Sequence, residues 1–244
     1  MARVAPAQVN QSLVNGLACL QELVLADRPI GVRELARQLD MDPTRVSRLL
    51  GTLSWLGLAS QDADRKYHPG PAVHVLSALS LHGSRLLADS LPVLREVAAE
   101  TGQVVALGVL WRSHVCYLYH GKAHTPLEQA MGARGPFPAR QSSIGRVLLA
   151  QFSPGELAEM CAREPELVPP EGIQALHETL GRVRERGYSR GGVQGESLAV
   201  AVGNPAIAAL AVAGCIDPEQ EVQLADRLRE AAARIHIGKS PVIP

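Results

Sequence analysis

Residues 30–56 constrain this chain more than any other segment, because they match two short helices joined by a tight turn. We expect a first helix over 32–39 and a second, amphipathic helix over 43–56, with apolar residues recurring at helical spacing in each. Between them, Asp40 is one of the few non-glycine residue types that tolerate a left-handed conformation. The segment therefore predicts a helix-turn-helix.

The residues that flank these helices are types that begin and end helices. Gly31 suits the N-cap of the first helix, with Glu34 at its N3 position. Asp42 suits the N-cap of the second, and Pro43 follows at N1, where a missing N–H costs nothing. Gly57 matches a C′ residue after the last turn. These signals predict both helices and their limits.

The second helix places polar side chains opposite its leucines, and the segment after it predicts a short hairpin over 58–70. A winged helix-turn-helix has this order, with its second helix in the DNA major groove and its wing near phosphates. The candidate DNA-contacting residues are Thr44, Arg45, Ser47 and Arg48 on the helix, and Arg65 and Lys66 beside the hairpin tip. The alternative is a simple helical hairpin with no DNA-binding role.

Charge does not by itself support a nucleic-acid partner. Residues 1–70 hold eight Lys or Arg and seven Asp or Glu, and the whole chain has a formal net charge of +0. Only the distribution favours DNA, since the basic side chains gather on one helix face and on the hairpin. With so few basic groups per subunit, we expect useful affinity to require two or more subunits bound together.

The composition is that of a globular chain without a membrane span. The chain has 244 residues, of which 46% are hydrophobic, enough for one generous core or two modest ones. It contains no run of about 18 uncharged apolar residues and no apolar stretch typical of a secretory signal. The four cysteines, at 19, 116, 161 and 215, form no C-x-x-C pair. We expect reduced thiols, no membrane partner and a cytoplasmic location.

Beyond the hairpin, the pattern predicts a linker helix over 73–91, and Pro92 is expected to open the next helix. Apolar runs at 104–110 and 114–120 predict paired strands, and those at 197–203 and 206–214 predict a later hairpin. Further helices are expected at 142–152, 154–163, 172–187 and 217–235, with a third strand at 126–132. The second domain is therefore expected to be α+β, an antiparallel sheet with helices packed on it.

Three motifs, in this order, resemble those of the IclR family of bacterial regulators. ELARQLDMDPTRVSRLLGTLSWLG followed by Tyr67-His68-Pro69-Gly70 is similar to the family's winged helix. PARQSSIGRVLLA (138–150), and then Arg186-Gly187-Tyr188 with ALAVAG (209–214), are similar to its second domain.

The resemblance implies a winged helix-turn-helix domain at 1–72, the linker helix at 73–91 and a GAF-like effector-binding domain at 92–240. It further implies a transcription regulator that is controlled by a small-molecule effector. The implied assembly is a homodimer or a dimer of dimers on a palindromic double-stranded operator. Whether binding represses or activates transcription is left open.

The resemblance also implies where the effector binds. The residues concerned are Met131, Phe137, Ser142, Ser143, Ile144, Gly191, Ser197, Leu198, Ala211 and Ala213. One position of the family's site is often Cys, and the motifs do not decide whether Ser197 or Leu198 corresponds to it. Gly191, Ala211 and Ala213 stand where polar residues are common, which favours an apolar or aromatic ligand. The helix start at Ser142 would favour an acidic group on it, although Ser142 also suits a simple helix cap. The alternative for the alanines is that they only pack a sheet against a helix.

No motif in the sequence predicts an enzyme. G-x-S-x-G, H-E-x-x-H, Walker A and strand-linked G-x-G-x-x-G patterns are missing, and Cys116 has no obvious base. His114, His120 and His124 form the closest histidine trio, and the first and second share strand parity, but solvated or core roles are commoner than metal binding. We expect no catalytic residue, no metal and no cofactor. The alternatives are a winged-helix regulator of another family with an unrelated sensor domain, and a small-molecule enzyme with an accessory helix-turn-helix.

Overall fold

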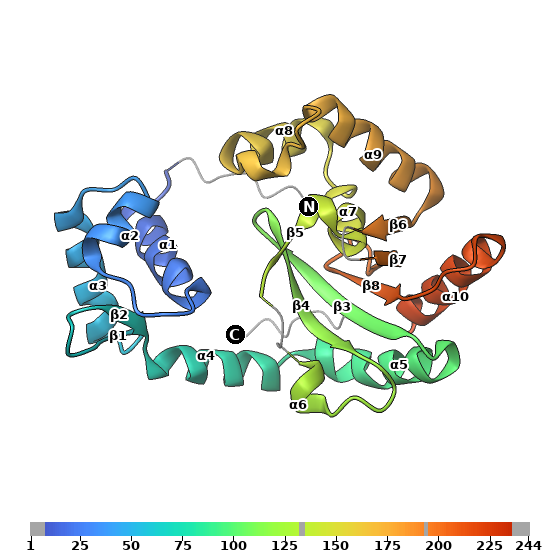
Figure 1. The fold of residues 1–244 in the computed structure, drawn as a ribbon, viewed down its shortest axis with the longest axis horizontal. Coiled ribbons are helices and arrows are strands. Elements are labelled where there is room, and N and C mark those ends of the chain that lie inside the picture. The colour runs from blue at the N-terminus through green and yellow to red at the C-terminus, as the bar shows by residue number, and fades with distance from the viewer. Residues whose placement is uncertain (1–7, 132–134, 193–194, 236–244) are drawn as a thin grey trace. The chain divides into compact units, whose positions relative to one another are not determined.

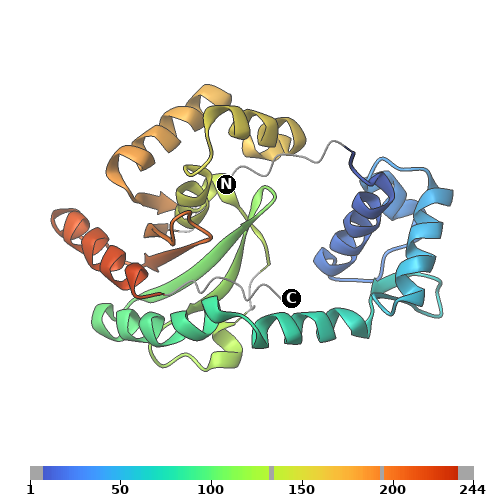
Figure 2. The same cartoon turned by 180° about the vertical axis from the view of Figure 1, so that it is seen from behind.

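The computed structural model of the protein describes residues 8–131, 135–192 and 195–235. The chain forms two compact units, an N-terminal unit that ends at Ser84 and a C-terminal unit that begins at Arg85. Figures 1 and 2 show the elements of both units from opposite sides. Among the described helices, none is long and apolar enough to cross a membrane.

The N-terminal unit is a winged helix-turn-helix. Its elements are α1 (Gln11–Leu25), α2 (Val32–Gln38), α3 (Pro43–Trp55), β1 (Ala59–Gln61), β2 (Tyr67–Pro69) and α4 (Pro71–His82). β1 and β2 pair antiparallel as the wing. Leu23 of α1, Leu35 of α2 and Leu50 of α3 are buried in one core, so the helix pair rests on α1, which the sequence pattern did not predict.

The local signals around the helix pair act as predicted. Gly31 is the N-cap of α2, and Asp40 adopts a left-handed conformation with a φ of 49°. The Asp42 carboxylate accepts hydrogen bonds from two N–H groups in the first turn of α3, at 2.8 and 3.2 Å. A Cβ on Gly70 would lie 2.2 Å from the carbonyl oxygen of Gly57, so only glycine fits where the wing returns to the end of α3.

In the C-terminal unit, the described residues form a six-stranded antiparallel sheet between two helical layers. The strands are β3 (Val104–Trp111), β4 (His114–Gly121), β5 (Phe137–Pro138), β6 (Ser189–Gly192), β7 (Gly195–Val202) and β8 (Ala208–Ala213), in the spatial order β5-β4-β3-β8-β7-β6. The helices are α5 (Arg85–Thr101), α6 (Leu127–Ala130), α7 (Ser143–Leu149), α8 (Pro154–Arg163), α9 (Ile173–Arg186) and α10 (Glu221–Ala233). Short 3₁₀ turns are η1 (Ala139–Gln141), η2 (Pro165–Leu167) and η3 (Pro218–Gln220).

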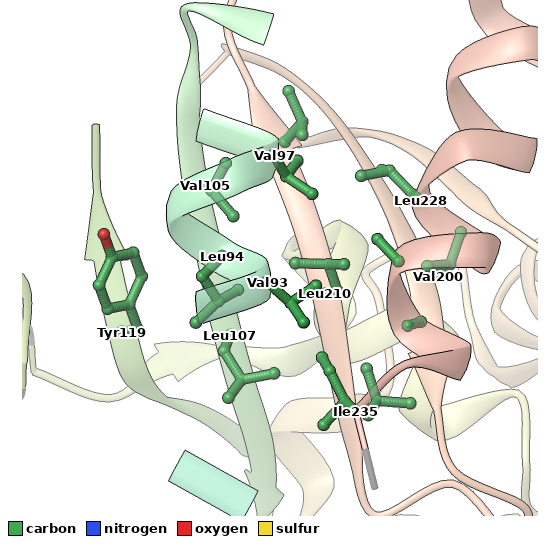
Figure 3. Close-up of a cluster of buried hydrophobic side chains, with 14 of the residues drawn as sticks. Val93, Leu94, Val97, Val105, Leu107, Tyr119, Val200, Leu210, Leu228 and Ile235 are labelled. Atoms are coloured by element: carbon green, nitrogen blue, oxygen red, sulfur yellow. The ribbon is translucent and has the colours of Figure 1, made fainter. Parts of the chain in front are cut away.

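The two faces of this sheet are covered by different helices. Val105 and Leu107 of β3 belong to a core under α5 and α10, where Leu94 and Leu228 meet the sheet (Figure 3). Ala106, between them in the sequence, belongs to the core under α7, α8 and α9. Alternate residues of β3 therefore face opposite helical layers, as the period of two along a strand requires.

The expected linker helix over 73–91 is interrupted, and Pro92 lies inside α5 rather than at a helix start. Both predictions are wrong. α4 ends at His82 and is capped by Gly83, a poor helix former. None of the residues of α4 is buried, so it lacks packing contacts that could extend the helix. α5 continues through Pro92 because Leu87 and Val93, on either side, are buried against the sheet. That packing outweighs the backbone hydrogen bond that proline removes.

Over its described part, 126–131, the segment 126–132 does not form the predicted strand, because residues 127–130 form one turn of helix with Ala130 buried. Residue 132 lies outside the described residues. The edge of β4 pairs instead with β5. The other predicted elements are confirmed as α7, α8, α9 and the β7–β8 hairpin, and the last helix proper begins at Glu221, after η3. α8 opens with a capping box in which Ser153 and Glu156 bond each other's backbone N–H.

Candidate DNA-binding surface and effector cavity

α3 presents its predicted contact residues on one exposed face. Val46 and Leu50, on the other side of the helix, are fully buried against the N-terminal core. The four exposed residues are Thr44, Arg45, Ser47 and Arg48. They occupy the N-terminal half of α3, which is the half that contacts base edges in helix-turn-helix proteins.

The two arginines of α3 differ in what holds them. With the Asn15 amide turned so that its oxygen faces α3, that oxygen accepts hydrogen bonds from Nε and Nη2 of Arg45, at 3.2 and 3.0 Å. Asn15 lies on α1 and is only 8% exposed, so in this orientation of the amide α1 holds the Arg45 guanidinium. Among the described residues, no side chain pairs with the guanidinium of Arg48, which extends from the surface.

Arg65 and Lys66 are exposed at the tip of the wing. Asp62 shapes this tip, since its carboxylate accepts the backbone N–H of Lys66 at 2.8 Å and Arg65 adopts a φ of 61°. Within the part of the N-terminal unit that the structure describes, none of the four basic residues of α3 and the wing forms an ion pair. The ion pair found in this part of the chain joins Arg28 to Glu34, at 2.6 Å. Asp42 and Asp62 accept backbone N–H groups and Glu34 pairs with Arg28, so these three carboxylates form no ion pair with the basic residues of α3 and the wing.

The C-terminal unit contains a cavity of about 190 Å³ between the sheet and α7. In the register of the sheet, Ala106 of β3 pairs with Ala211 of β8, and Val104 pairs with Ala213. Ser197 of β7 pairs with Ala213 from the other side. These residues share the face that α7 covers and form the cavity floor. The floor is hollow because three of its residues are alanines, which leave space that longer side chains would fill.

Hydroxyl groups line the cavity beside the alanines, on Ser197 of the floor and on the wall residues Ser142, Ser143 and Tyr117. Ser197 Oγ donates to Ser143 Oγ at 2.8 Å, and Tyr117 Oη lies 3.5 Å from Ser142 Oγ. Ser142 Oγ also accepts the backbone N–H of Gly145 at 3.3 Å, so Ser142 is the N-cap of α7 as well as a wall residue.

β4 contributes two wall residues that the sequence did not predict, Tyr117 and His120. Their rings meet edge to face, with centroids 5.8 Å apart and planes at 87°. A bulge at Leu107/Gly108 puts both on one face although they are three residues apart. The one sequence signal for the bulge is Gly108, where a Cβ would lie 2.8 Å from the Val115 side chain.

The structure brings seven of the ten predicted effector-site residues to the cavity: Phe137, Ser142, Ser143, Ile144, Ser197, Ala211 and Ala213. The other three lie elsewhere. Leu198 is fully buried on the opposite sheet face, Met131 packs against that same core, and the carbonyl of Gly191 accepts a hydrogen bond from Arg146. The strand register thus places Ser197, and not Leu198, at the cavity. Unpredicted lining residues are Val104, Ala106, Tyr117, His120, Gln141, Gly192, Gly195 and Glu196.

Arg140 and Arg146, beside the cavity in the sequence, bind backbone carbonyls instead of lining it. Arg140 Nε donates to the carbonyl of Glu166 at 2.8 Å. Arg146 Nη2 donates to the carbonyls of Arg190, at 3.3 Å, and Gly191, which ties β6 to α7. Burial, and to a smaller extent nearby Arg182, lowers the pKa of the Arg146 guanidinium below its usual value.

His114 and His120 lie on opposite faces of β4, although their spacing of six residues would put them on one face of a regular strand. His114 pairs with Trp111 and His120 with Ala106, which have opposite parity on β3, because the bulge shifts the alternation. Within residues 8–131, 135–192 and 195–235, no group of three His, Cys, Asp or Glu side chains is placed to hold a metal ion. Burial raises the pKa of the Cys116 thiol, which disfavours the thiolate that a nucleophile needs.

Family models match both units. Residues 12–63 match the IclR helix-turn-helix domain, and residues 78–235 match the domain described as bacterial transcriptional regulator IclR C-terminal. The chain is similar to the HTH-type transcriptional regulator BhcR of Paracoccus denitrificans, with 31% identity over 176 residues. That alignment covers 69% of this chain and 62% of BhcR.

Solved structures show the same fold. An IclR family transcriptional regulator from Brucella abortus matches with a TM-score of 0.76 and 23% identity, over 93% of this chain and 92% of that one. An IclR homologue from Microbacterium hydrocarbonoxydans, solved in complex with 4-hydroxybenzoate, matches with a TM-score of 0.60 and 24% identity, over 92% and 97%. With the two family models spanning both units, the chain belongs to the IclR family of bacterial transcriptional regulators.

Proposed function

We propose that this protein binds an operator in double-stranded DNA through α3 and the wing, and that a small molecule in the C-terminal cavity controls this binding. The observation that carries the proposal is the exposed face of α3, where Arg45 and Arg48 form no ion pair with any carboxylate that the structure describes. Guanidinium groups at this end of a recognition helix bind guanine edges or phosphates. Thr44 and Ser47 are placed for adjacent contacts, and Arg65 and Lys66 for phosphates beside the wing.

The proposed DNA-binding form is a homodimer or a dimer of dimers on a palindromic operator. Each phosphate that a basic side chain neutralises adds one increment of affinity, and one subunit offers few such side chains. Two copies related by a twofold axis would double the contacts and match two half-sites about one DNA turn apart. Because its partner is chromosomal DNA, the cytoplasm is the proposed location.

The proposed effector is a small apolar or aromatic molecule that carries an acidic group. An apolar cavity of ~150 Å³ accepts benzene, so a cavity of about 190 Å³ suits one ring with a small substituent. The complex of the Microbacterium hydrocarbonoxydans homologue with 4-hydroxybenzoate supports a ligand of this kind.

The proposed role of the cavity is binding rather than catalysis. The hydroxyls of Ser143 and Ser197 bond to each other, and that of Ser142 bonds to a helix N–H and the Tyr117 hydroxyl. A ligand on the floor touches β3, whose alternate residue Val105 packs under α5. A change in the packing of α5 would then shift the population of DNA-binding states through the chain that leads to α4.

Arg48→Ala tests the DNA-binding face in the full chain. An operator is first selected from random duplexes, and affinity is measured by fluorescence anisotropy at one fixed salt concentration. We expect Arg48→Ala to weaken operator binding by about 1–3 kcal/mol. Arg163→Ala removes the same charge from an exposed site on α8 and should bind like the unmodified protein. Unchanged operator binding in both Arg45→Ala and Arg48→Ala would show that α3 is not the reading surface.

Ala211→Leu tests the cavity separately. The longer side chain would fill the floor, so the variant should bind the operator normally but lose its response to 4-hydroxybenzoate, measured as operator release. Ala211→Ser is the matched control, because it adds one atom and leaves most of the space. A full response in Ala211→Leu would exclude this cavity as the effector site.

A further inference from the structure

The polar groups around the cavity indicate which part of a ligand each would hold, an inference that rests on the proposed effector site. We propose that His120 recognises the acidic group of the effector, with its protonated imidazole paired to the carboxylate of a small aromatic acid. His120 would then be a specificity-determining residue that selects aromatic carboxylates over neutral aromatic molecules.

His120 is the one side chain that can carry a positive charge among the described residues that line the cavity. Arg140 and Arg146 are directed to backbone carbonyls outside it. Arg190, the arginine of β6, forms ion pairs with the carboxylates of Glu196 and Glu221. Among the described residues, a carboxylate in the cavity therefore has a single cationic partner, His120.

The hydroxyls of the wall leave donors to spare. Each hydroxyl has one hydrogen, so the Ser197–Ser143 pair uses one hydrogen in its mutual bond and keeps one. The Tyr117–Ser142 pair likewise uses one of its two hydroxyl hydrogens in the mutual bond and keeps the other. The bond from the Gly145 N–H to the Ser142 oxygen uses no hydroxyl hydrogen. A wall with a surplus of O–H donors is complemented by an acceptor-only group, and a carboxylate is such a group.

The floor places an apolar ring next to His120. Across the sheet, His120 pairs with Ala106, and Ala106 pairs with Ala211, so the three side chains form one row on the same face. A flat ring that rests on the two alanines has its edge at the imidazole. A carboxyl substituent on that edge lies beside His120, and neither alanine of this row places a polar side chain in between.

The other charged and titratable groups that face the cavity do not compete for this role. They are Tyr117, edge-on to His120, and Glu196 at the start of β7. The Glu196 side chain is 52% exposed and pairs with Arg190 at 3.1 Å. The lining residues of β3, β5, η1, α7 and β8 are uncharged.

The test is calorimetric titration of the full chain with benzoate and with benzamide, its neutral counterpart, at about pH 6 and about pH 8. Because the proposed pairing requires the protonated imidazole, we expect benzoate affinity to fall about tenfold or more as the pH rises over this range, while benzamide affinity stays constant. Titration in two buffers of different ionisation enthalpy should show proton uptake with benzoate. His120→Gln should weaken benzoate about tenfold and abolish its pH dependence.

His114→Gln is the matched control, since His114 lies on the same strand outside the cavity and faces Glu166. It should bind benzoate like the unmodified protein. If His120→Gln keeps the affinity and pH dependence while Ala211→Leu loses binding, His120 has no such role but the cavity remains the effector site. If Ala211→Leu leaves benzoate binding intact, the proposed site itself is wrong. No binding of benzoate to the unmodified protein at either pH overturns the acidic ligand class.

Discussion

At the scale of single residues, the proposed DNA-binding face of α3 depends on the Asn15–Arg45 pair that joins α1 to α3. Asn15 is nearly buried and holds two donors of the Arg45 guanidinium, so it orients a side chain that we expect to contact DNA. Asn15→Ala should weaken operator binding although Asn15 itself is not on the exposed face. The expected loss is about 1 kcal/mol, typical of hydrogen bonds that position a group.

A double-mutant cycle separates orientation from a general loss of stability. In an Arg45→Ala background, Asn15→Ala should have no further effect on operator affinity, because there is no guanidinium left to orient. Anisotropy at constant salt gives the four affinities. Additive losses would show that Asn15 acts through the fold of the N-terminal unit instead.

Gly145 controls how closely α7 approaches η1. A Cβ there would lie 2.1 Å from the carbonyl oxygen of Ala139, so Gly145→Ala forces the cavity wall to move and should lower the free energy of unfolding by about 1–3 kcal/mol. Gly181→Ala, in the open middle of α9, is the control and should be neutral or stabilising by about 0.5–1 kcal/mol. In a Trp55→Phe background, the fluorescence of Trp111 reports urea unfolding of the C-terminal unit. Equal effects of the two substitutions would contradict this account.

Single residues were predictable from sequence where their role is local. Asp42 as a cap and the exposed positions Arg45 and Arg48 follow from neighbours within one helical turn. The choice between Ser197 and Leu198 depends on strand register, which two adjacent residues cannot reveal. His120 was missed for the same reason, since a bulge in the β3–β4 ladder decides its face.

At the scale of elements, an ion pair links β6 to the first turn of α10. Burial alone would raise the pKa of Glu221, but hydrogen bonds from Arg190 and Tyr188 outweigh it and hold the pKa of that carboxyl below its usual value. A pKa lowered in the folded state means that the ionised carboxylate stabilises the fold above the unfolded pKa near 4.3. This contribution is lost as the pH falls through the folded value.

Glu221→Gln should therefore cost about 1–3 kcal/mol at neutral pH and flatten the acid dependence of stability. The free energy of unfolding of the C-terminal unit, followed by Trp111 fluorescence between about pH 6 and about pH 3, should fall less steeply in the variant than in the parent. Glu219→Gln, at an exposed site in η3, is the control and should retain the parent slope. A parent-like slope in Glu221→Gln would rule out this link as a source of acid sensitivity.

Elements were predictable where caps or strict periodicity mark them. α8 begins with a capping box, and α9 ends at a left-handed Gly187. The limits of both helices were predicted to within about two residues. β6 has the sequence SRGG, which has no apolar alternation, and it forms a strand only because β7 lies beside it. α5 continues through Pro92 for a similar reason, because buried contacts outweigh local propensity.

At the scale of the whole molecule, α4 is the element that most clearly requires a partner. None of its residues is buried, although Val75, Leu76 and Leu79 are apolar and 57–66% exposed. An isolated helix of fewer than about 12–15 residues is marginal in water, so a helix of this length is expected to persist by packing against another surface. Leu13 of α1 is also 61% exposed. The proposed homodimer gives these faces a partner. From the sequence, the charge count and the family resemblance indicated it, and the apolar pattern of α4 did not.

Leu79→Glu tests whether α4 holds two copies together. A charge placed at the centre of an apolar interface should dissociate the assembly, so sedimentation velocity at micromolar concentration should show a dimer or tetramer for the parent and a smaller species for the variant. Val222→Glu is the control, because it places the same charge at a residue of α10 that is 60% exposed. Since the salt dependence of DNA binding counts neutralised phosphates, its slope should fall to about half in Leu79→Glu if one subunit binds where two did before. A variant that keeps both the parent mass and the parent slope would mean that α4 packs against something other than a second copy.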